Sequence, residues 1–525
     1  MIENEQFPMI AKTMAELEDV LSEELIALGA NNIEIGTRMV SFTGDKALMY
    51  KANIHCRTAL RILRPIYNFK AETADEVYEA VKNFKWDEYL TLDTTFSIDA
   101  VVFSHIFTHS KFVAYRVKDA IADWFTEKYD KRPSVSITNP DIFINVHISH
   151  NKCTLSLDSS GESLHKRGYR LSQTEAPLSE VLAAGMILKS GWRGEGTLID
   201  PMCGSGTILI EAAMIALGIP PGIHRSNFAF EKWRDFDEEL FSEIYNDDSG
   251  TRDFKHKIIG SDISSKAISI AEKNIKNAGL KKYIELSVKP FQQYSEAPAP
   301  EGVLITNPPY GERIKVEELE ELYSMIGERL KHVFAGFKAY ILSYKKESFD
   351  AIGLKHTKRY FLYNGPLECE MREYEIFSGK RNEQSGKSFA RSKSTQRDSY
   401  HYERNSREGY RRSKRNENRE GAPQSRRNED DSLDRSFDKE SGKRNRPLNK
   451  GPRREDKPFD KEPRRGGRSF DARTKDKPRK PYKEKGEERF SRDSSKNKPA
   501  NNDQKRKITF GRNPKSFKPK RRDNS

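Results

Sequence analysis

Residues 198–213, LIDPMCGSGTILIEAA, indicate the fold of the second half of this chain. An apolar run ends at Asp200, Gly204 and Gly206 bracket a short loop, and a helical apolar pattern follows. Glycine lets a backbone turn sharply and approach a ligand closely, and ligands of parallel sheets lie beyond the carboxyl ends of the strands. The stretch therefore predicts a strand, a glycine turn and a helix at the edge of a binding site, although a plain tight turn is the alternative.

The chemistry of this turn favours one kind of ligand. No Lys-Ser/Thr pair follows the glycines, which argues against a phosphate-binding P-loop. A carboxylate at the strand end suits a cationic amino group better than a phosphate. The turn is thus more typical of a site for a cationic amino group than of a phosphate site.

Strand and helix patterns alternate over residues 160–380, which predicts a parallel sheet with right-handed crossovers. The last two strand patterns, HTKRYFLY and LECEMREYEIF, are joined through Asn364-Gly365, a strong hairpin signal. A parallel sheet closed by an antiparallel hairpin differs from a plain nucleotide-binding sheet.

A second acidic strand end follows in IIGSD, where Asp262 either accepts hydrogen bonds from ribose hydroxyls or caps the helix that begins near Ser264. Two acidic strand ends of this kind ordinarily lie about 20 residues apart. Asp262 instead lies 62 positions after Asp200, so the spacing predicts an insertion at 219–255. Its conspicuous side chains suit either nucleic-acid contact or a small folded cap: Arg225, Phe228, Phe230 and Trp233.

Residues 306–313, TNPPYGER, follow another apolar run. The prolines make a rigid, extended turn. The Asn307 side-chain oxygen and the Pro308 carbonyl can each accept one N–H of a planar amine, which would localise its lone pair towards an electrophilic methyl group. Tyr310 can stack on an extruded base, a contact worth about 1–3 kcal/mol. The pattern predicts methyl transfer to an exocyclic amine that relies on alignment and electrostatics, although ordinary turn chemistry is the alternative.

Charge divides the chain near residue 380. Residues 381–525 hold 47 Lys and Arg against 24 Asp and Glu, which leaves 46 against 55 for residues 1–380. The tail has no Val, Cys, Met or Trp, so we expect it to be disordered. Its basic residues and spaced aromatics suit nonspecific RNA attraction, although a solubilising extension is the alternative. The four cysteines form no CxxC pair, and no signal peptide or membrane span is recognisable, so we expect a cytoplasmic protein without a metal.

The motifs together resemble a known family. Residues 160–380 resemble a class I S-adenosylmethionine-dependent methyltransferase. With DSSGESLHKRGYR at 158–170 and RVKDAIADWF at 116–125, the chain resembles the THUMP-domain RNA methyltransferases, above all those that methylate guanine N2 in bacterial 23S rRNA. The resemblance implies an α/β fold with four parts: a ferredoxin-like unit (1–60), a THUMP RNA-binding domain (61–160), a Rossmann-like, seven-stranded catalytic domain (161–380) and the tail (381–525).

The resemblance also implies the site. The amine pocket would be formed by Asn307, Pro308, Pro309 and Tyr310. The cofactor S-adenosylmethionine would be bound by Asp200, Pro201, Cys203, Gly204, Ser205, Gly206, Thr207, Asp262, Phe291 and Asn307. Asp200 and the glycines would line its methionine side and Asp262 would hold its ribose. One departure concerns adenine: the third strand leads to Lys289-Pro290-Phe291 without the family's acidic residue, so Phe291 stacking would replace a hydrogen bond.

A basic cluster in LHKRGYR links the two halves of the body and lies near the expected mouth of the site. His165, Lys166, Arg167 and Arg170 are candidates for orienting RNA through its phosphates, with a solvated linker as the alternative. The resemblance implies that this RNA is 23S rRNA or a large-subunit precursor. Two other functions stay open: amine methylation of DNA adenine or of a protein glutamine, and a non-catalytic RNA-binding or ribosome-assembly factor.

Overall fold

The computed structural model describes residues 5–175, 177–309 and 316–377. Tyr310 and the tail at 381–525 lie outside these described residues, and so do the predictions made for them. Within the described part, the four cysteines are buried free thiols, and no helix has the length and apolarity to cross a membrane.

The first half forms one eight-stranded sheet in the order β2-β3-β1-β4-β8-β7-β5-β6. Its strands are β1 (Phe7–Thr13), β2 (Asn31–Gly36), β3 (Met39–Gly44), β4 (Ala59–Lys70), β5 (Thr95–Phe103), β6 (Ser134–Val135), β7 (Ile142–Ser149) and β8 (Lys152–Asp158). Its helices are α1 (Glu18–Ala27), α2 (Lys46–His55), α3 (Ala74–Lys82) and α4 (Ser110–Tyr129), with a short 3-10 turn at Trp86–Glu88. The boundary expected after residue 60 falls inside β4, which pairs with both β1 and β8.

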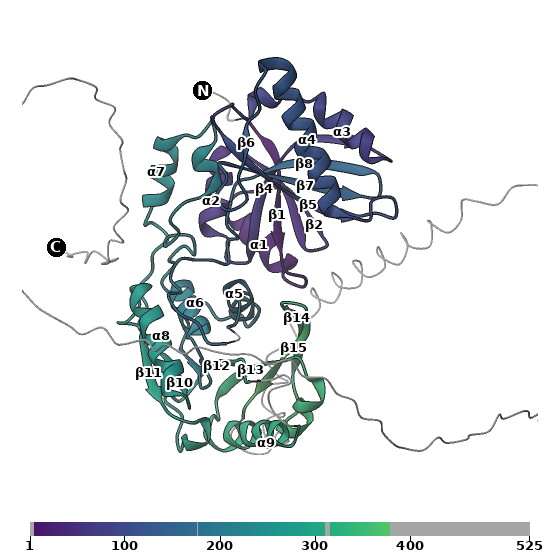
Figure 1. Cartoon of the computed structure of the whole chain (residues 1–525). Coiled ribbons are helices and arrows are strands. Elements are labelled where there is room, and N and C mark those ends of the chain that lie inside the picture. Colours follow the sequence, from purple (N-terminus) through teal and green to yellow (C-terminus); the bar gives the residue numbers. More distant parts are fainter. Residues whose placement is uncertain (1–4, 176, 310–315, 378–525) are drawn as a thin grey trace, which may run out of the picture. The chain divides into compact units, whose positions relative to one another are not determined.

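Local chemistry explains the ends of these helices. Asp45 caps α2 by accepting from the Leu48 amide at 2.8 Å, and Thr73 caps α3 by accepting from the Glu76 amide at 3.1 Å. Helices α3 and α4 lie side by side over the β5–β7–β8 part of the sheet (Figure 1), where the Tyr78 hydroxyl donates to Asp123. Helices α2 and α3 therefore each begin at a residue whose side chain satisfies a free backbone amide of the first turn.

The second half forms a seven-stranded sheet in the order β11-β10-β9-β12-β13-β15-β14. Its strands are β9 (Thr197–Asp200), β10 (Ile258–Asp262), β11 (Ile284–Val288), β12 (Gly302–Thr306), β13 (Phe337–Ser343), β14 (Lys358–Asn364) and β15 (Leu367–Glu375). Its helices are α5 (Glu180–Lys189), α6 (Thr207–Ala216), α7 (Glu238–Asn246), α8 (Ser265–Asn277) and α9 (Val316–Val333), with 3-10 turns at Ala229–Lys232, Phe291–Gln293 and Lys346–Ile352. Strands β9 to β13 are parallel, whereas β14 and β15 pair antiparallel, which confirms the predicted fold.

Two hydrophobic cores cover the two faces of this sheet. Helices α5, α6 and α8 contribute to one core and α9 to the other. Successive residues of β9 alternate between them, since Leu198 packs into the first and Ile199 into the second. Because both faces of the sheet are buried, the sequences of the parallel strands are continuous apolar runs.

The insertion at 219–255 is a folded segment. Phe228 and Phe230 are buried, with ring centroids 5.3 Å apart, and Phe230 stacks on Tyr50 of α2 at 4.4 Å. Of the two alternatives for these aromatics, the structure therefore shows the folded cap. Helix α5 had no signal in the sequence reasoning, because its residues are buried all round and lack an amphipathic pattern.

Candidate functional site

Strands β10, β9 and β12 are neighbours and parallel, so their carboxyl ends meet at one edge of the sheet. The glycine turn after β9 adopts the backbone that its sequence implies: Gly204 has φ +54° and Gly206 has φ +82°. A Cβ on Gly206 would lie 3.1 Å from the Cβ of Ala271 in α8, so both conformation and packing require glycine there. The turn is held to β10 by the Cys203 amide, which donates to the Ser261 carbonyl at 2.9 Å.

Asp262 lies at the end of β10 and faces this turn. One carboxylate oxygen accepts from the Gly204 amide at 3.0 Å and the other from the Ser264 amide at 2.9 Å. The cap of α8 is Ser264, whose hydroxyl accepts from the Ala267 amide at 3.2 Å. The alternative in which Asp262 caps the helix is thus not what the structure shows, and its carboxylate keeps lone pairs for hydroxyl donors.

Asp200 is buried at the end of β9, only 1% exposed. Its carboxylate accepts from the Thr306 hydroxyl at 2.8 Å and from the Met202 amide at 3.2 Å. Burial raises the pKa of Asp200 to about 7, and Asp262 adds to the rise, whereas the two hydrogen bonds oppose it. The carboxyl group therefore changes charge near neutral pH.

Asn307 directly follows β12. Its side-chain oxygen is buried and accepts no hydrogen bond from any described residue. Pro308 is buried and Pro309 is exposed. A buried acceptor without a donor is costly, so this oxygen has the character of a group kept for a ligand.

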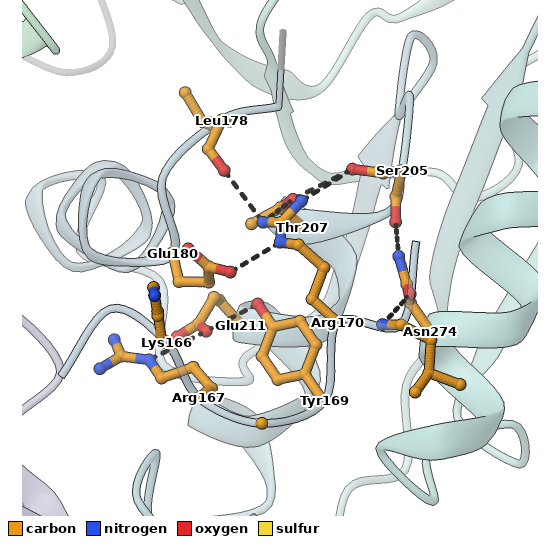
Figure 2. A network of polar contacts seen from close by, with 12 residues as sticks. Lys166, Arg167, Tyr169, Arg170, Leu178, Glu180, Ser205, Thr207, Glu211 and Asn274 are labelled. Atoms are coloured by element: carbon orange, nitrogen blue, oxygen red, sulfur yellow. Dashed lines mark hydrogen bonds and ion pairs between the residues drawn. The ribbon is translucent and has the colours of Figure 1, made fainter. Parts of the chain in front are cut away.

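A segment before α5, which we call the strap (residues 165–173), reaches the glycine turn through Arg170. Figure 2 shows this side chain at the centre of a polar network. Its guanidinium donates to Glu180 at 2.7 Å, to the Leu178 carbonyl at 3.1 Å, to the Ser205 hydroxyl at 3.2 Å and to the Thr207 hydroxyl at 3.0 Å. The side chains of Ser205 and Thr207, expected to bind cofactor, are thus engaged by Arg170.

Helix α8 holds the other side of the strap. Asn274, 1% exposed, accepts from the amides of Leu171 and Ser172 and donates to the carbonyls of Ser172 and Ser205. Sequence reasoning missed this residue. The available signal was a polar residue at an apolar position of the helical pattern, between Ala271 and Ile275.

The predicted basic cluster needs correction. Arg167 is 2% exposed, pairs with Glu211 at 3.4 Å and donates to the carbonyl of Leu164, so it cannot reach a phosphate from this position. Arg170 is occupied by its hydrogen bonds to Glu180, to Leu178 and to the glycine turn. Two members are accessible: Lys166 is exposed, and His165 is half-buried with a pKa lowered by burial.

Phe291 lies in the second core rather than at an open surface. It is 3% exposed, and its ring packs 5.9 Å from Tyr294 and 5.5 Å from Phe334, measured between centroids. Pro201 and Cys203 are buried in the turn. Within the described residues no group of three or more His, Cys, Asp or Glu side chains could hold a metal ion.

The strand order, the glycine turn and the acidic strand ends define a class I S-adenosylmethionine-dependent methyltransferase. Family models agree along the chain: an RlmL ferredoxin-like domain matches residues 8–63, a THUMP domain 71–158 and an RMKL-like methyltransferase domain 167–373. The chain belongs to the family of RNA methyltransferases that join a THUMP domain to an RlmL-like methyltransferase domain.

Relatives show how much of the chain this likeness covers. A Synechocystis protein named "Putative RNA methyltransferase slr0064" is 40% identical over 373 residues, which are 70% of this chain and 97% of that protein. The ribosomal RNA large subunit methyltransferase K/L of Syntrophotalea carbinolica is also 40% identical over 373 residues, 69% of this chain but 52% of that protein. The chain therefore spans about half the length of the K/L relatives.

Solved structures extend the likeness to three dimensions. The structure of SMU.472 complexed with SAH is 31% identical with a TM-score of 0.65, and it covers 71% of this chain and 99% of its own. A "predicted N6-adenine-specific DNA methylase" from Listeria monocytogenes is 31% identical with a TM-score of 0.64, covering 71% and 97%. SAH is the demethylated product of S-adenosylmethionine, which agrees with the predicted cofactor.

Proposed function

We propose that this chain transfers a methyl group from S-adenosylmethionine to the exocyclic N2 amine of a guanine in large-subunit rRNA. The observation that carries the reaction type is the buried Asn307 side-chain oxygen, which has no donor among the described residues. It follows a strand whose last residue, Thr306, is bonded to Asp200 beside the glycine turn. An acceptor for an N–H thus stands next to the expected methyl donor.

The residues of this edge fit the cofactor in a simple division of roles. Asp200 would hold the cationic amino group, the glycine turn would let the backbone approach the methionine part, and Asp262 would accept from ribose hydroxyls. Bound there, S-adenosylmethionine supplies an electrophilic methyl group. Because the Phe291 ring is buried, it would support the adenine side of the site from within the core and would not stack on the adenine itself.

The amine pocket would act by alignment. The target base leaves its stack, as bases do in enzymes that modify them. Asn307 accepts one N–H of the amine and the Pro308 carbonyl accepts the other, so the nitrogen lone pair is directed at the methyl group. The amine gains the methyl group and then releases one proton, which requires no strong base in the pocket.

The substrate is inferred from the rest of the chain. The THUMP domain supports RNA, and the names of the K/L relatives support large-subunit rRNA and therefore a cytoplasmic enzyme. For phosphate contact we retain Lys166 and His165, since both are accessible.

The test is mass spectrometry of nucleosides from 23S rRNA of a strain that lacks the gene, before and after incubation with the purified chain and S-adenosylmethionine. We expect N2-methylguanosine to be reduced in the strain and restored in vitro. Unchanged N2-methylguanosine would refute guanine N2 as the target. Calorimetric titration with S-adenosylmethionine distinguishes the enzyme from the non-catalytic alternative, because that alternative predicts no binding of S-adenosylmethionine even at low salt.

A further inference from the structure

A cavity of about 750 Å³ borders the strap. Its other walls come from Met14, which follows β1, and Leu60 of β4, from the residues that flank the strap at 162–163 and 177–180, from the turn at 225–227 and from the β14–β15 turn at Asn364 and Gly365. Neither the acidic strand ends nor Asn307 line it, so it is separate from the cofactor edge. Pockets of about 300–1,000 Å³ hold small organic ligands, so one nucleotide fits this volume.

The wall of the cavity is positively charged. The charge comes from Arg225, because the other two arginines of the wall are paired with buried carboxylates, Arg167 with Glu211 and Arg170 with Glu180, and Lys166 pairs with Glu162. Arg225 differs from the other arginines because the four hydrogen bonds that hold its buried guanidinium all go to backbone carbonyls, those of Ser160, Glu162, Ser163 and Lys166. Burial lowers the pKa of Arg225 to about 10, which still leaves it charged at neutral pH. The cavity therefore favours an anion.

Accessible polar side chains line the same cavity as the Arg225 guanidinium. Lys166, Gln173 and Asn227 line the cavity and are exposed. Lys166 pairs with Glu162, but both side chains are more than half exposed, at 56% and 60%. Such exposed pairs are weak, so a phosphate can replace the carboxylate at little cost. The cavity thus combines a fixed buried charge with a movable surface ammonium.

The Arg170 side chain connects the cavity to the glycine turn of the expected methyl-transfer site. Arg170 forms part of its wall and also donates to the Ser205 and Thr207 hydroxyls of the glycine turn (Figure 2). A ligand held here would lie next to the residues that position the cofactor. This location suits part of the substrate better than an unrelated small molecule.

We propose that the cavity binds one nucleotide of the RNA substrate close to the target guanine. Its phosphodiester is anchored by Lys166 and by the field of Arg225, while Gln173 and Asn227 contact sugar or base edges. The inference rests on the proposed function for the identity of the RNA. It assigns a second contact point, outside the THUMP domain, that orients the strand relative to the amine pocket.

The experiment uses the full-length chain and 23S rRNA, with binding measured by filter retention over a series of KCl concentrations. Asn227→Asp places a negative charge in the cavity with little change in shape, and we expect RNA affinity to fall at least fivefold. Lys166→Ala removes one phosphate contact, which should make the slope of log affinity against log salt shallower by about 0.7. Asn31→Asp, the same charge change at an exposed position outside the cavity, serves as the matched control.

S-adenosylmethionine affinity and melting temperature are measured for each variant, and we expect both to match the unmodified chain. The proposal would be overturned if both cavity variants had the same RNA affinity and the same salt slope as Asn31→Asp. A second result would also overturn the proposal. If calorimetry showed tight binding of guanosine monophosphate that Asn227→Asp abolished while RNA affinity stayed unchanged, the cavity would be a site for a free nucleotide. These readouts need no methyl transfer. A different methylated product together with weakened RNA binding in the variants would refute only the proposed function.

Discussion

The Thr306 hydroxyl lies 2.8 Å from a carboxylate oxygen of Asp200, and this contact joins the ends of two neighbouring strands. Asp200 opens the glycine turn, and Thr306 immediately precedes Asn307. A single hydrogen bond therefore connects the expected cofactor side of the site to the expected amine side. Because both residues are buried, the contact is shielded from competing water.

Replacing this hydroxyl should affect stability and cofactor binding together. Thr306→Val leaves the buried Asp200 carboxylate with one donor fewer, so we expect a loss of about 1–3 kcal/mol in the free energy of unfolding. Urea denaturation measures this loss, and calorimetry should show weaker S-adenosylmethionine binding. Thr306→Ser keeps the hydroxyl and is the control. Equal losses in both variants would mean that packing of the methyl group, not the hydrogen bond, matters.

Cofactor affinity should depend on pH through Asp200. Its pKa of about 7 in the folded chain lies above the ordinary value of 3.8, so the carboxyl group is neutral in acid and charged above neutrality. A cationic amino group requires the charged form, so affinity should rise up to tenfold per pH unit below pH 7 and level off above it. Calorimetry from pH 5.5 to 8.5 measures this.

The same pKa predicts the opposite trend for folding of the free chain. Between about pH 4 and 7 the folded state retains a proton that the unfolded chain has lost, so the Asp200 contribution to stability falls as pH rises through this window. Asp200→Asn should remove this component and flatten the rise in cofactor affinity. A rise that persists in Asp200→Asn would assign the titration to another group.

Asn307→Ala should separate catalysis from cofactor binding. The substitution removes the acceptor for the target amine, and losing one preorganised polar contact of this kind costs about 100- to 1,000-fold in rate. We expect kcat to fall by this amount while S-adenosylmethionine affinity stays within about twofold. Stopped-flow transfer to rRNA and calorimetry provide the two values. A collapse of cofactor affinity instead would identify Asn307 as a residue that shapes the cofactor side.

Arg170→Ala should destabilise the strap. It leaves Glu180, 5% exposed, without its ion-pair partner and frees the Ser205 and Thr207 hydroxyls. Breaking a buried pair in this way costs about 3–5 kcal/mol. Urea denaturation should show this loss, with a reduced affinity for S-adenosylmethionine.

The double variant Arg170→Met with Glu180→Met tests the mechanism, because removing both charges avoids an unpaired buried carboxylate. It should recover most of the stability but not the cofactor affinity, since the hydroxyls of the glycine turn still lack their donor. Recovery of both would show that Arg170 matters for folding alone.

Deleting residues 381–525 removes 47 basic side chains. RNA binding should weaken, and its salt dependence should become flatter, because fewer counterions are released. Filter binding over a salt series measures both, and circular dichroism checks that the remaining chain stays folded. An unchanged salt slope would remove the proposed role of the tail.

Local patterns in the sequence were sufficient for the catalytic sheet. The apolar runs, the glycine turn at 204–206 and the Asn364-Gly365 hairpin are signals within a few residues, and each appears in the structure where it was expected. Turn geometry and side-chain periodicity depend on neighbouring residues, so one sequence suffices to predict them. Asp262 and Asn307 could be located for the same reason, because both follow strand ends.

Contacts between distant residues were decided only by the tertiary structure. Arg167 and Arg170 look like neighbours in one exposed basic cluster, yet Arg167 is buried against Glu211 and Arg170 reaches the glycine turn 35 positions away. The bond between Thr306 and Asp200 spans 106 positions. Charge and residue type predict that an arginine seeks anions or carbonyls, but only the packing of helices around it determines which partners it meets. The sequence alone determined the sheet and the residues at its edge, and the fold decided which of the basic side chains remain free for RNA.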